Sequence, residues 1–227
     1  MALKAFIFDL DGTVIQSQNV LKMSLQQYFT QEQCRVLMEH YPYLKGLNEE
    51  QAAHAIKDIL AIAHISIDQL RRDLIALCIE NKNRTGIAYV HGFEQFYKHY
   101  ATYDIVHCIA TNGRGASLAA TLKIIDLPCI FGDKIYTPEH VGGKTKPDPA
   151  IFLYALDQLG CKKEEAIIFE DSHPGVAAAH AAGIACIGIN TAGSLDQDKD
   201  NLLLCVENYN DLTMDLIVKK FLEHCSG

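Results

Sequence analysis

Residues 4–13 read KAFIFDLDGT, and this stretch decides the fold. Its first half is a short apolar run rich in residues that favour β-strands, and it ends at the carboxylates of Asp9 and Asp11. An apolar run of this length, followed at once by acidic loop residues, indicates a strand that is buried on both faces. Strands of that kind occur in parallel sheets that helices cover on both sides.

Beyond residue 91 the chain alternates between strand-like and helix-like segments. The predicted strands are 104–111, 127–131, 166–170, 184–189 and 202–206, and the predicted helices are 116–125, 149–159, 176–182 and 210–224. Apolar strands that alternate with helices are typical of a parallel sheet with both faces covered. The sequence therefore predicts the α/β class, with a Rossmann-like parallel sheet as the core.

The segment between the first strand and this alternating region has a different pattern. From about residue 17 to residue 84, apolar residues recur at helical spacing, and Gln, Glu, Ala and Leu are frequent. Asn48, with Gln51 three residues later, is a candidate helix N-cap, and Ser66 or Asp68 begins the next helix. We expect an all-helical cap at residues 15–89, inserted into a core formed by residues 1–14 and 90–227.

Composition excludes several classes of partner. The 227 residues include 20 Lys and Arg against 28 Asp and Glu, a net charge of −8, so we expect neither nucleic acid nor a membrane as partner. No apolar run reaches the roughly 18 residues of a membrane span, and the N-terminus lacks the apolar region of a signal peptide. The eight cysteines form no C-x-x-C pair, and several lie in apolar runs, as reduced thiols do. We expect a cytoplasmic monomer.

Polar residues follow three of the predicted strands. Asp9 and Asp11 follow the first strand, residues 111–113 follow another, and Glu170 and Asp171 follow a third. Ligands of open α/β sheets bind beyond the carboxyl ends of the strands. Four carboxyl groups gathered there would repel one another, and Mg²⁺ would relieve that repulsion. One carboxylate could then attack a phosphate ester while a second acts as general acid and base.

Two further segments could contact a phosphoryl group. The Thr111 hydroxyl and the N–H groups of Asn112 and Gly113 either hold phosphoryl oxygens or form a tight turn after a strand. Lys146 precedes Pro147, and a proline-stiffened segment would aim its ammonium at a transferring phosphoryl group. The alternative for Lys146 is an ordinary surface lysine.

The order of these motifs along the chain is specific. A strand with DxDGT, a strand with TNG, Lys-Pro-x-Pro before a helix, and a strand with EDSxxG follow one another. The sequence resembles the haloacid dehalogenase superfamily, in the branch that carries a helical cap after the first motif. Within that branch it is similar to the β-phosphoglucomutase and phosphoglycolate phosphatase group. The resemblance covers residues 4–14 and 91–190, and in the cap it is limited to residues 44–46.

This resemblance implies a Mg²⁺-dependent phosphatase that acts on a small phosphorylated metabolite. The substrate would be a sugar phosphate, phosphoglycolate or a nucleotide-like compound, and the reaction would pass through an aspartyl-phosphate. The resemblance implies that Asp9 is the nucleophile and Asp11 the general acid and base. It implies that Thr111, with Asn112 and Gly113, binds the phosphoryl group and that Lys146 bridges the nucleophile and the phosphate. The implied metal ligands are Asp9, the Asp11 backbone carbonyl, Glu170 and Asp171.

The cap carries less information. Lys45 and Gly46 are candidates for substrate contact, or they form an exposed turn. Two alternatives to hydrolysis stay open: a phosphosugar mutase, and a catalytically silent regulatory protein that binds phosphate. The related mutases have a histidine ten residues after the second aspartate and a basic residue three after the Lys-Gly pair. Here those positions are Leu21 and Glu49, and both substitutions favour hydrolysis.

Overall fold

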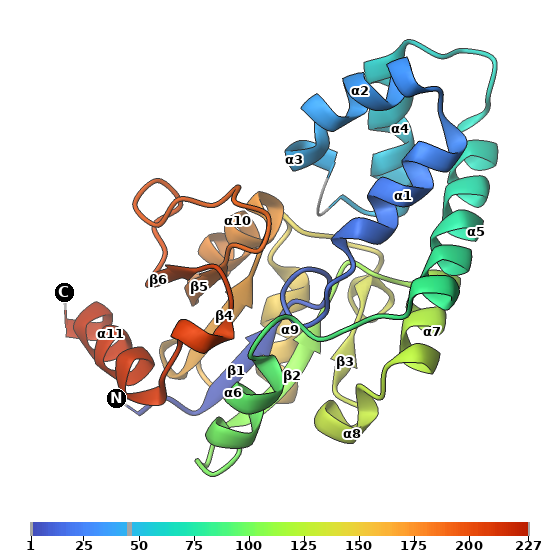
Figure 1. Ribbon diagram of the computed structural model, residues 1–227. Helices are drawn as coiled ribbons and strands as arrows, with labels where there is room; N and C mark the ends of the chain where they lie inside the picture. Colours follow the sequence, from blue (N-terminus) through green and yellow to red (C-terminus); the bar gives the residue numbers. More distant parts are fainter. Residues whose placement is uncertain (1, 45–46, 227) are drawn as a thin grey trace.

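A parallel sheet forms the core of the computed structural model, which describes residues 2–44 and 47–226 (Figure 1). Within these residues the sheet has six strands in the order β3-β2-β1-β4-β5-β6. The strands are Ala5–Phe8 (β1), Val106–Ala110 (β2), Ile135–Tyr136 (β3), Ala166–Glu170 (β4), Ala185–Ile189 (β5) and Leu204–Val206 (β6). Neighbouring strands run parallel throughout. The α/β fold class that the sequence predicts is therefore confirmed.

The first strand of the chain lies in the middle of this sheet. All four residues of β1 are buried, and Phe8 lies beside Ile109 of β2 and Phe169 of β4. The chain continues from β1 to β2 on one side and later adds β4 on the other side. Because the three strands run parallel in this register, the residues that follow them emerge at one edge, next to the topological switch point.

Helices cover both faces of the sheet. On one face, Phe6 and Phe8 of β1 pack in a core to which α6 (Phe93–Tyr100) and α11 (Met214–Ser226) contribute. On the other face, Ile7 packs in a core that includes α9 (Ala150–Gln158) and α10 (His173–Ala182). Alternate residues of a strand point to opposite faces. The apolar run in β1 therefore supplies both cores at once.

The segment between β1 and α6 is helical, as predicted. Its helices are α1 (Gln18–Tyr28), α2 (Gln31–Glu39), α3 (Tyr41–Leu44), α4 (Glu49–Leu60) and α5 (Ile67–Thr85). They share a core of their own that includes Leu25, Leu37 and Leu70. Asn48 caps α4 in a capping box with Gln51, which confirms the predicted N-cap. Figure 1 shows these helices gathered beyond the carboxyl ends of the strands.

The prediction of a strand at residues 127–131 is wrong. This segment forms the short helix α8 (Pro128–Phe131), and the edge strand β3 follows it at Ile135–Tyr136. A proline in the first turn of a helix costs little, because the N–H it lacks would have no partner there. Leu127 and Phe131 are four residues apart and both buried. That spacing places both side chains on one face of a helical turn.

The remaining elements agree with the predicted pattern, with ends shifted by a few residues. Among them, α7 (Gly115–Ile124) corresponds to the predicted helix at 116–125. The sequence does not predict the 3₁₀ turns η1 (Pro138–Val141), η2 (Lys163–Glu165) and η3 (Tyr209–Asp211). The eight cysteines all belong to the described residues, and all are free thiols, as expected. None of the helices in the described ranges is long and apolar enough to cross a bilayer.

Candidate active site

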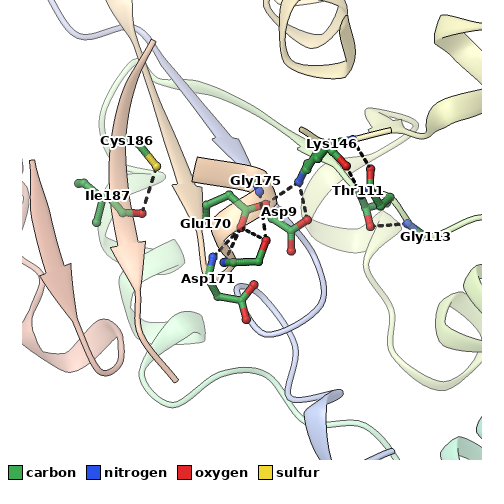
Figure 2. A network of polar contacts seen from close by, with 11 residues as sticks. Asp9, Thr111, Gly113, Lys146, Glu170, Asp171, Gly175, Cys186 and Ile187 are labelled. Carbon is green, nitrogen blue, oxygen red and sulfur yellow. Dashed lines mark hydrogen bonds and ion pairs between the residues drawn. The ribbon is translucent and has the colours of Figure 1, made fainter. Parts of the chain in front are cut away.

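Three strand ends bring the predicted polar residues together. Asp9 follows β1, Thr111 follows β2, and Glu170 ends β4 with Asp171 directly after it. All four residues are buried, with side chains that face a common space (Figure 2). Pairing of β1 with both β2 and β4 makes them neighbours, although they are far apart in the sequence.

Lys146 reaches this space from the loop between η1 and α9. Its ammonium donates to Asp9 Oδ1 at 2.6 Å and to Glu170 Oε1 at 2.8 Å, and the residue is only 2% exposed. The Phe152 ring lies below the ammonium, with its centroid 4.6 Å from Nζ, a geometry that attracts a cation. Lys146 is therefore a buried lysine of the site, and the alternative of a surface lysine is wrong.

The Glu170 carboxylate is held on both oxygens. Oε2 accepts from the Asp171 and Ser172 backbone N–H groups at 2.8 Å each and from Ser172 Oγ at 3.0 Å, while Oε1 accepts from Lys146 (Figure 2). Gly175 lies against this carboxylate: a Cβ at that position would lie 1.8 Å from Oε1. The roles of Ser172 and Gly175 escape sequence reasoning, although both belong to the EDSxxG pattern.

The charges at this edge do not balance. Oxygens of Asp9, Glu170 and Asp171 lie within 4.8 Å of one another, and this is the only such group among the described residues. Burial raises the pKa of Asp9, and the neighbouring Glu170 and Asp171 carboxylates raise it further, against the effect of Lys146. Burial opposes the charge of Lys146, but the Asp9 and Glu170 carboxylates outweigh it and raise the pKa of Lys146.

This donor set fits a hard divalent cation. Three buried carboxylates meet a single ammonium, so negative charge remains in excess. Mg²⁺ prefers one or two carboxylates together with water and phosphate oxygens. Oε2 of Glu170 already accepts three hydrogen bonds, whereas Oε1 accepts one, from Lys146. An ion could therefore bind to oxygens of Asp9 and Asp171 and to Oε1 of Glu170. The Asp11 carboxylate is not part of the three-carboxylate group.

The predicted phosphoryl-binding loop, residues 111–113, lies on the other side of Asp9 from Glu170 and Asp171 (Figure 2). Thr111 Oγ1 accepts from the Gly113 N–H at 2.9 Å, and Asn112 Oδ1 accepts from the Lys146 N–H at 2.9 Å. A Cβ at Gly113 would lie 3.2 Å from Thr111 Oγ1 and 3.6 Å from Asp11 Oδ2. Asp11 is thus close to this loop and, unlike Asp9, exposed to solvent. The structure brings together every core residue that the sequence singles out.

A cavity of about 210 Å³ joins these residues to the cap. On the cap side its lining includes Leu21, Asn48, Glu49, Cys78 and Lys82. This volume is below the roughly 300–1,000 Å³ of sites for drug-sized ligands, so the cavity suits a small molecule. The predicted contacts of Lys45 and Gly46 lie outside the described residues. Sequence reasoning misses Asn48 and Lys82 as site residues, because helical spacing alone does not show which cap residues face the core.

Two contacts hold the cap against the core beside this cavity. The Asn48 side-chain amide donates to Thr145 Oγ1 at 3.2 Å. The Lys82 ammonium donates to Ser117 Oγ at 3.0 Å and to Thr121 Oγ1 at 2.9 Å, and both of these residues belong to α7. The cavity is therefore bounded by the strand ends on one side and by docked cap helices on the other. A larger hollow of about 850 Å³ elsewhere is not lined by Asp9, Asp11, Glu170 or Asp171.

Comparison with known proteins places the chain in a family. The sequence model of the haloacid dehalogenase-like hydrolases matches residues 6–189. The chain belongs to the haloacid dehalogenase-like hydrolase family. This match confirms the resemblance seen in the motifs, and it spans the strand ends, Lys146 and the inserted helices.

Individual relatives of this hydrolase family are distant. Hexitol phosphatase A of Escherichia coli is 26% identical over 198 residues, which cover 84% of each chain. The β-phosphoglucomutase of Clostridium difficile shares the fold, with a TM-score of 0.76, 18% identity and coverage of 99% of this chain and 100% of that chain. The chain spans 18% of the length of the chloroplastic protein SUPPRESSOR OF QUENCHING 1 of Arabidopsis thaliana, with 23% identity over 189 residues and 82% of this chain covered.

The close approach of Gly175 to Glu170 predicts that Gly175→Ala damages the site. The added methyl group must displace the Glu170 carboxylate, and Lys146 then loses one of its two partners. Changes to groups that hold a ligand residue typically cost about 10- to 100-fold in activity, so we expect a loss of that size in the hydrolysis of an aryl phosphate. Ala177→Ser, at an exposed position of the same helix, is the matched control and should keep the wild-type rate. A Gly175→Ala protein as active as this control would contradict the role of Gly175.

Proposed function

We propose that this protein is a Mg²⁺-dependent phosphatase that hydrolyses a small phosphorylated metabolite through an aspartyl-phosphate. The observation that carries the proposal is the buried Asp9 carboxylate, which lies 2.6 Å from the Lys146 ammonium and beside Asp171. A fixed cation on one side and the edge of the sheet on the other orient this carboxylate so that it can attack phosphorus. Family membership and the phosphatase among its relatives support the same conclusion.

The proposed reaction has two steps. In the first, an Asp9 oxygen attacks phosphorus, the bond between phosphorus and the ester oxygen breaks, and Asp11 gives its proton to the leaving alcohol. In the second, Asp11 takes a proton from water, the water oxygen attacks phosphorus, and the Asp9 carboxylate is released with inorganic phosphate. Asp11 is suited to both proton transfers because it lines the cavity and remains exposed to solvent.

The other core residues would stabilise the transferring group. The Lys146 ammonium offsets negative charge that develops on the phosphoryl oxygens. The Gly113 N–H donates to Thr111 Oγ1 and so orients the Thr111 hydroxyl, whose own proton would bind a phosphoryl oxygen. Asp9, Glu170, Asp171 and the Asp11 backbone carbonyl would hold Mg²⁺, and Glu170 also holds Lys146 nearby. When bound, Mg²⁺ neutralises the phosphate and lets it approach an acidic site.

The helical segment would act as a cap over this chemistry. We propose residues 15–89 as the cap and residues 1–14 and 90–227 as the catalytic core. Closure would exclude bulk water from the aspartyl-phosphate until Asp11 activates one molecule. The cap contacts at Asn48 and Lys82 hold the cavity closed on one side. The small volume of the cavity suits a metabolite of few carbon atoms.

Asp9→Asn should abolish phosphate release, by roughly 10³-fold or more, because an amide is a poor nucleophile. The measurement is inorganic phosphate released from an aryl phosphate with Mg²⁺ present, together with circular dichroism to check the fold. Asp157→Asn, an exposed aspartate on α9, is the matched control and should keep the wild-type rate. A folded Asp9→Asn protein that retains most of the activity would exclude Asp9 as nucleophile.

Removal of metal should stop turnover, since excess negative charge then faces the substrate phosphate. We expect a chelator to abolish activity and Mg²⁺ to restore it. Asp171→Asn should raise the Mg²⁺ concentration needed for half-maximal rate by roughly tenfold or more, because loss of a carboxylate weakens a hard-cation site. The same titration on Asp157→Asn should match the wild type. Full activity after thorough chelation would contradict the metal dependence.

The mutase alternative predicts a different product. Leu21 lines the cavity and cannot donate or accept a proton, so it cannot provide the gating that the mutases obtain from histidine. We therefore expect β-glucose 1-phosphate, with a trace of the bisphosphate, to give free phosphate and little glucose 6-phosphate. A coupled dehydrogenase assay measures the sugar product. Rapid formation of glucose 6-phosphate with little free phosphate would make the protein a mutase, and no turnover of any phosphate ester would favour the silent binding protein.

A further inference from the structure

The cap side of the cavity presents a carboxylate that the proposed reaction does not use. Glu49 is the first residue of α4, lies half-buried, and lines the same cavity as Asp11 and Lys146. Among residues 2–44 and 47–226, the Glu49 carboxylate accepts no hydrogen bond and forms no ion pair. A carboxylate in this position is available to a ligand.

The residues on either side of Glu49 fix where it lies. Asn48 donates to Thr145 Oγ1 at 3.2 Å, and Thr145 directly precedes Lys146. Glu50 lies 3.7 Å from the Arg114 guanidinium, at the N-terminus of α7. The Asn48 side chain also accepts from the Glu50 N–H at 3.0 Å, so the first turn of α4 is rigid. Glu49 is therefore held between two contacts that join the cap to the core.

Lys82 lines the cavity together with Glu49 and is committed to other partners. Lys82 donates to the Ser117 carbonyl at 3.1 Å, to Ser117 Oγ at 3.0 Å and to Thr121 Oγ1 at 2.9 Å. These three bonds use all three hydrogens of the ammonium. Arg114 pairs with Glu50. Lys82 therefore has no free donor for a second anionic group of a ligand, and Arg114 is not among the described residues that line the cavity.

The surroundings of Glu49 favour a ligand that donates hydrogen bonds. Burial raises the pKa of Glu49, against the effects of Arg114, Arg71 and Lys82. A partly desolvated carboxylate gains from a hydroxyl or ammonium donor and disfavours a second negative charge. Nearby, the cavity is lined by aliphatic side chains, which suit the carbon backbone of a ligand; these are Val20, Leu21, Leu44, Leu47 and Ala52.

We propose that Glu49 is a specificity-determining residue: it accepts a hydrogen bond from the leaving group and rejects leaving groups with a negative charge at that end. The inference rests on the proposed phosphatase activity and deepens it. It removes phosphoglycolate and sugar bisphosphates from the range of substrates. It leaves monophosphates of polyols, sugars and amino sugars, whose hydroxyl or ammonium groups can face α4.

Two matched substrate pairs test this proposal. Glycerol 3-phosphate and 3-phosphoglycerate differ by one CH₂OH group in place of a carboxylate, and so do glucitol 6-phosphate and 6-phosphogluconate. With wild-type protein and Mg²⁺ we expect kcat/KM to favour the alcohol of at least one pair by about tenfold or more. In Glu49→Gln the preference should shrink severalfold, and in Glu49→Lys it should reverse. Asp58→Asn removes a negative charge from an exposed position of the same helix, and it should leave the preference at its wild-type value.

The outcomes separate this inference from the proposed function. The role of Glu49 is overturned if the wild-type protein has equal kcat/KM for both members of each substrate pair. It is also overturned if the wild-type protein shows a preference that Glu49→Gln leaves unchanged. In both cases, turnover of the aryl phosphate still supports a phosphatase. The role of Glu49 is also overturned if the wild-type protein prefers the carboxylate substrates and Lys82→Met loses that preference. Lys82 would then be an anion-binding residue. Absence of phosphate release from every compound, the aryl phosphate included, overturns both. If Glu49→Lys fails to fold, the nearly isosteric Glu49→Gln decides.

Discussion

The contact of one buried ammonium with two buried carboxylates organises the active site. Lys146 lies between Asp9 and Glu170, and each of the three comes from a different part of the sheet edge. Buried charges are expensive unless each is paired and hydrogen-bonded. The parallel register of β1 and β4, the backbone donors that hold Glu170, and the absence of a side chain at Gly175 together meet that requirement. A shift in any of them would leave a charge unpaired.

In the proposed function, the chemistry and the choice of substrate belong to different parts of the chain. The strand ends supply the charges that act on a phosphoryl group, whereas the cap supplies the remaining lining of a small cavity. The two parts meet at the first turn of α4, where Asn48 contacts Thr145 and Glu50 faces Arg114. A cap held at these points presents Glu49 to the leaving group. Changes in α4 can therefore alter specificity while the strand ends keep the same reaction.

The sequence predicts the core better than the cap for physical reasons. Strand ends of a parallel sheet share one edge, so Asp9, Thr111 and Glu170 could be grouped from local pattern alone. The helix Pro128–Phe131 escapes prediction because short apolar runs suit strand and helix equally. The parts played by Lys82 and Gly175 depend on contacts with residues far away in the sequence. Helical periodicity shows which face of a helix is buried, but it does not show which element packs against that face.

The proposed reaction depends on Asp9 as nucleophile and on Asp11 as general acid and base. An aryl phosphate has a good leaving group and does not need the acid, so Asp11→Asn should form the aspartyl-phosphate and then fail to hydrolyse it. Rapid mixing of this variant with the aryl phosphate and Mg²⁺, followed by acid quench and peptide mass analysis, tests this directly. We predict a burst that approaches one phenolate per protein, with the phosphoryl group on Asp9. Steady turnover without a burst and without modified Asp9 would contradict the account.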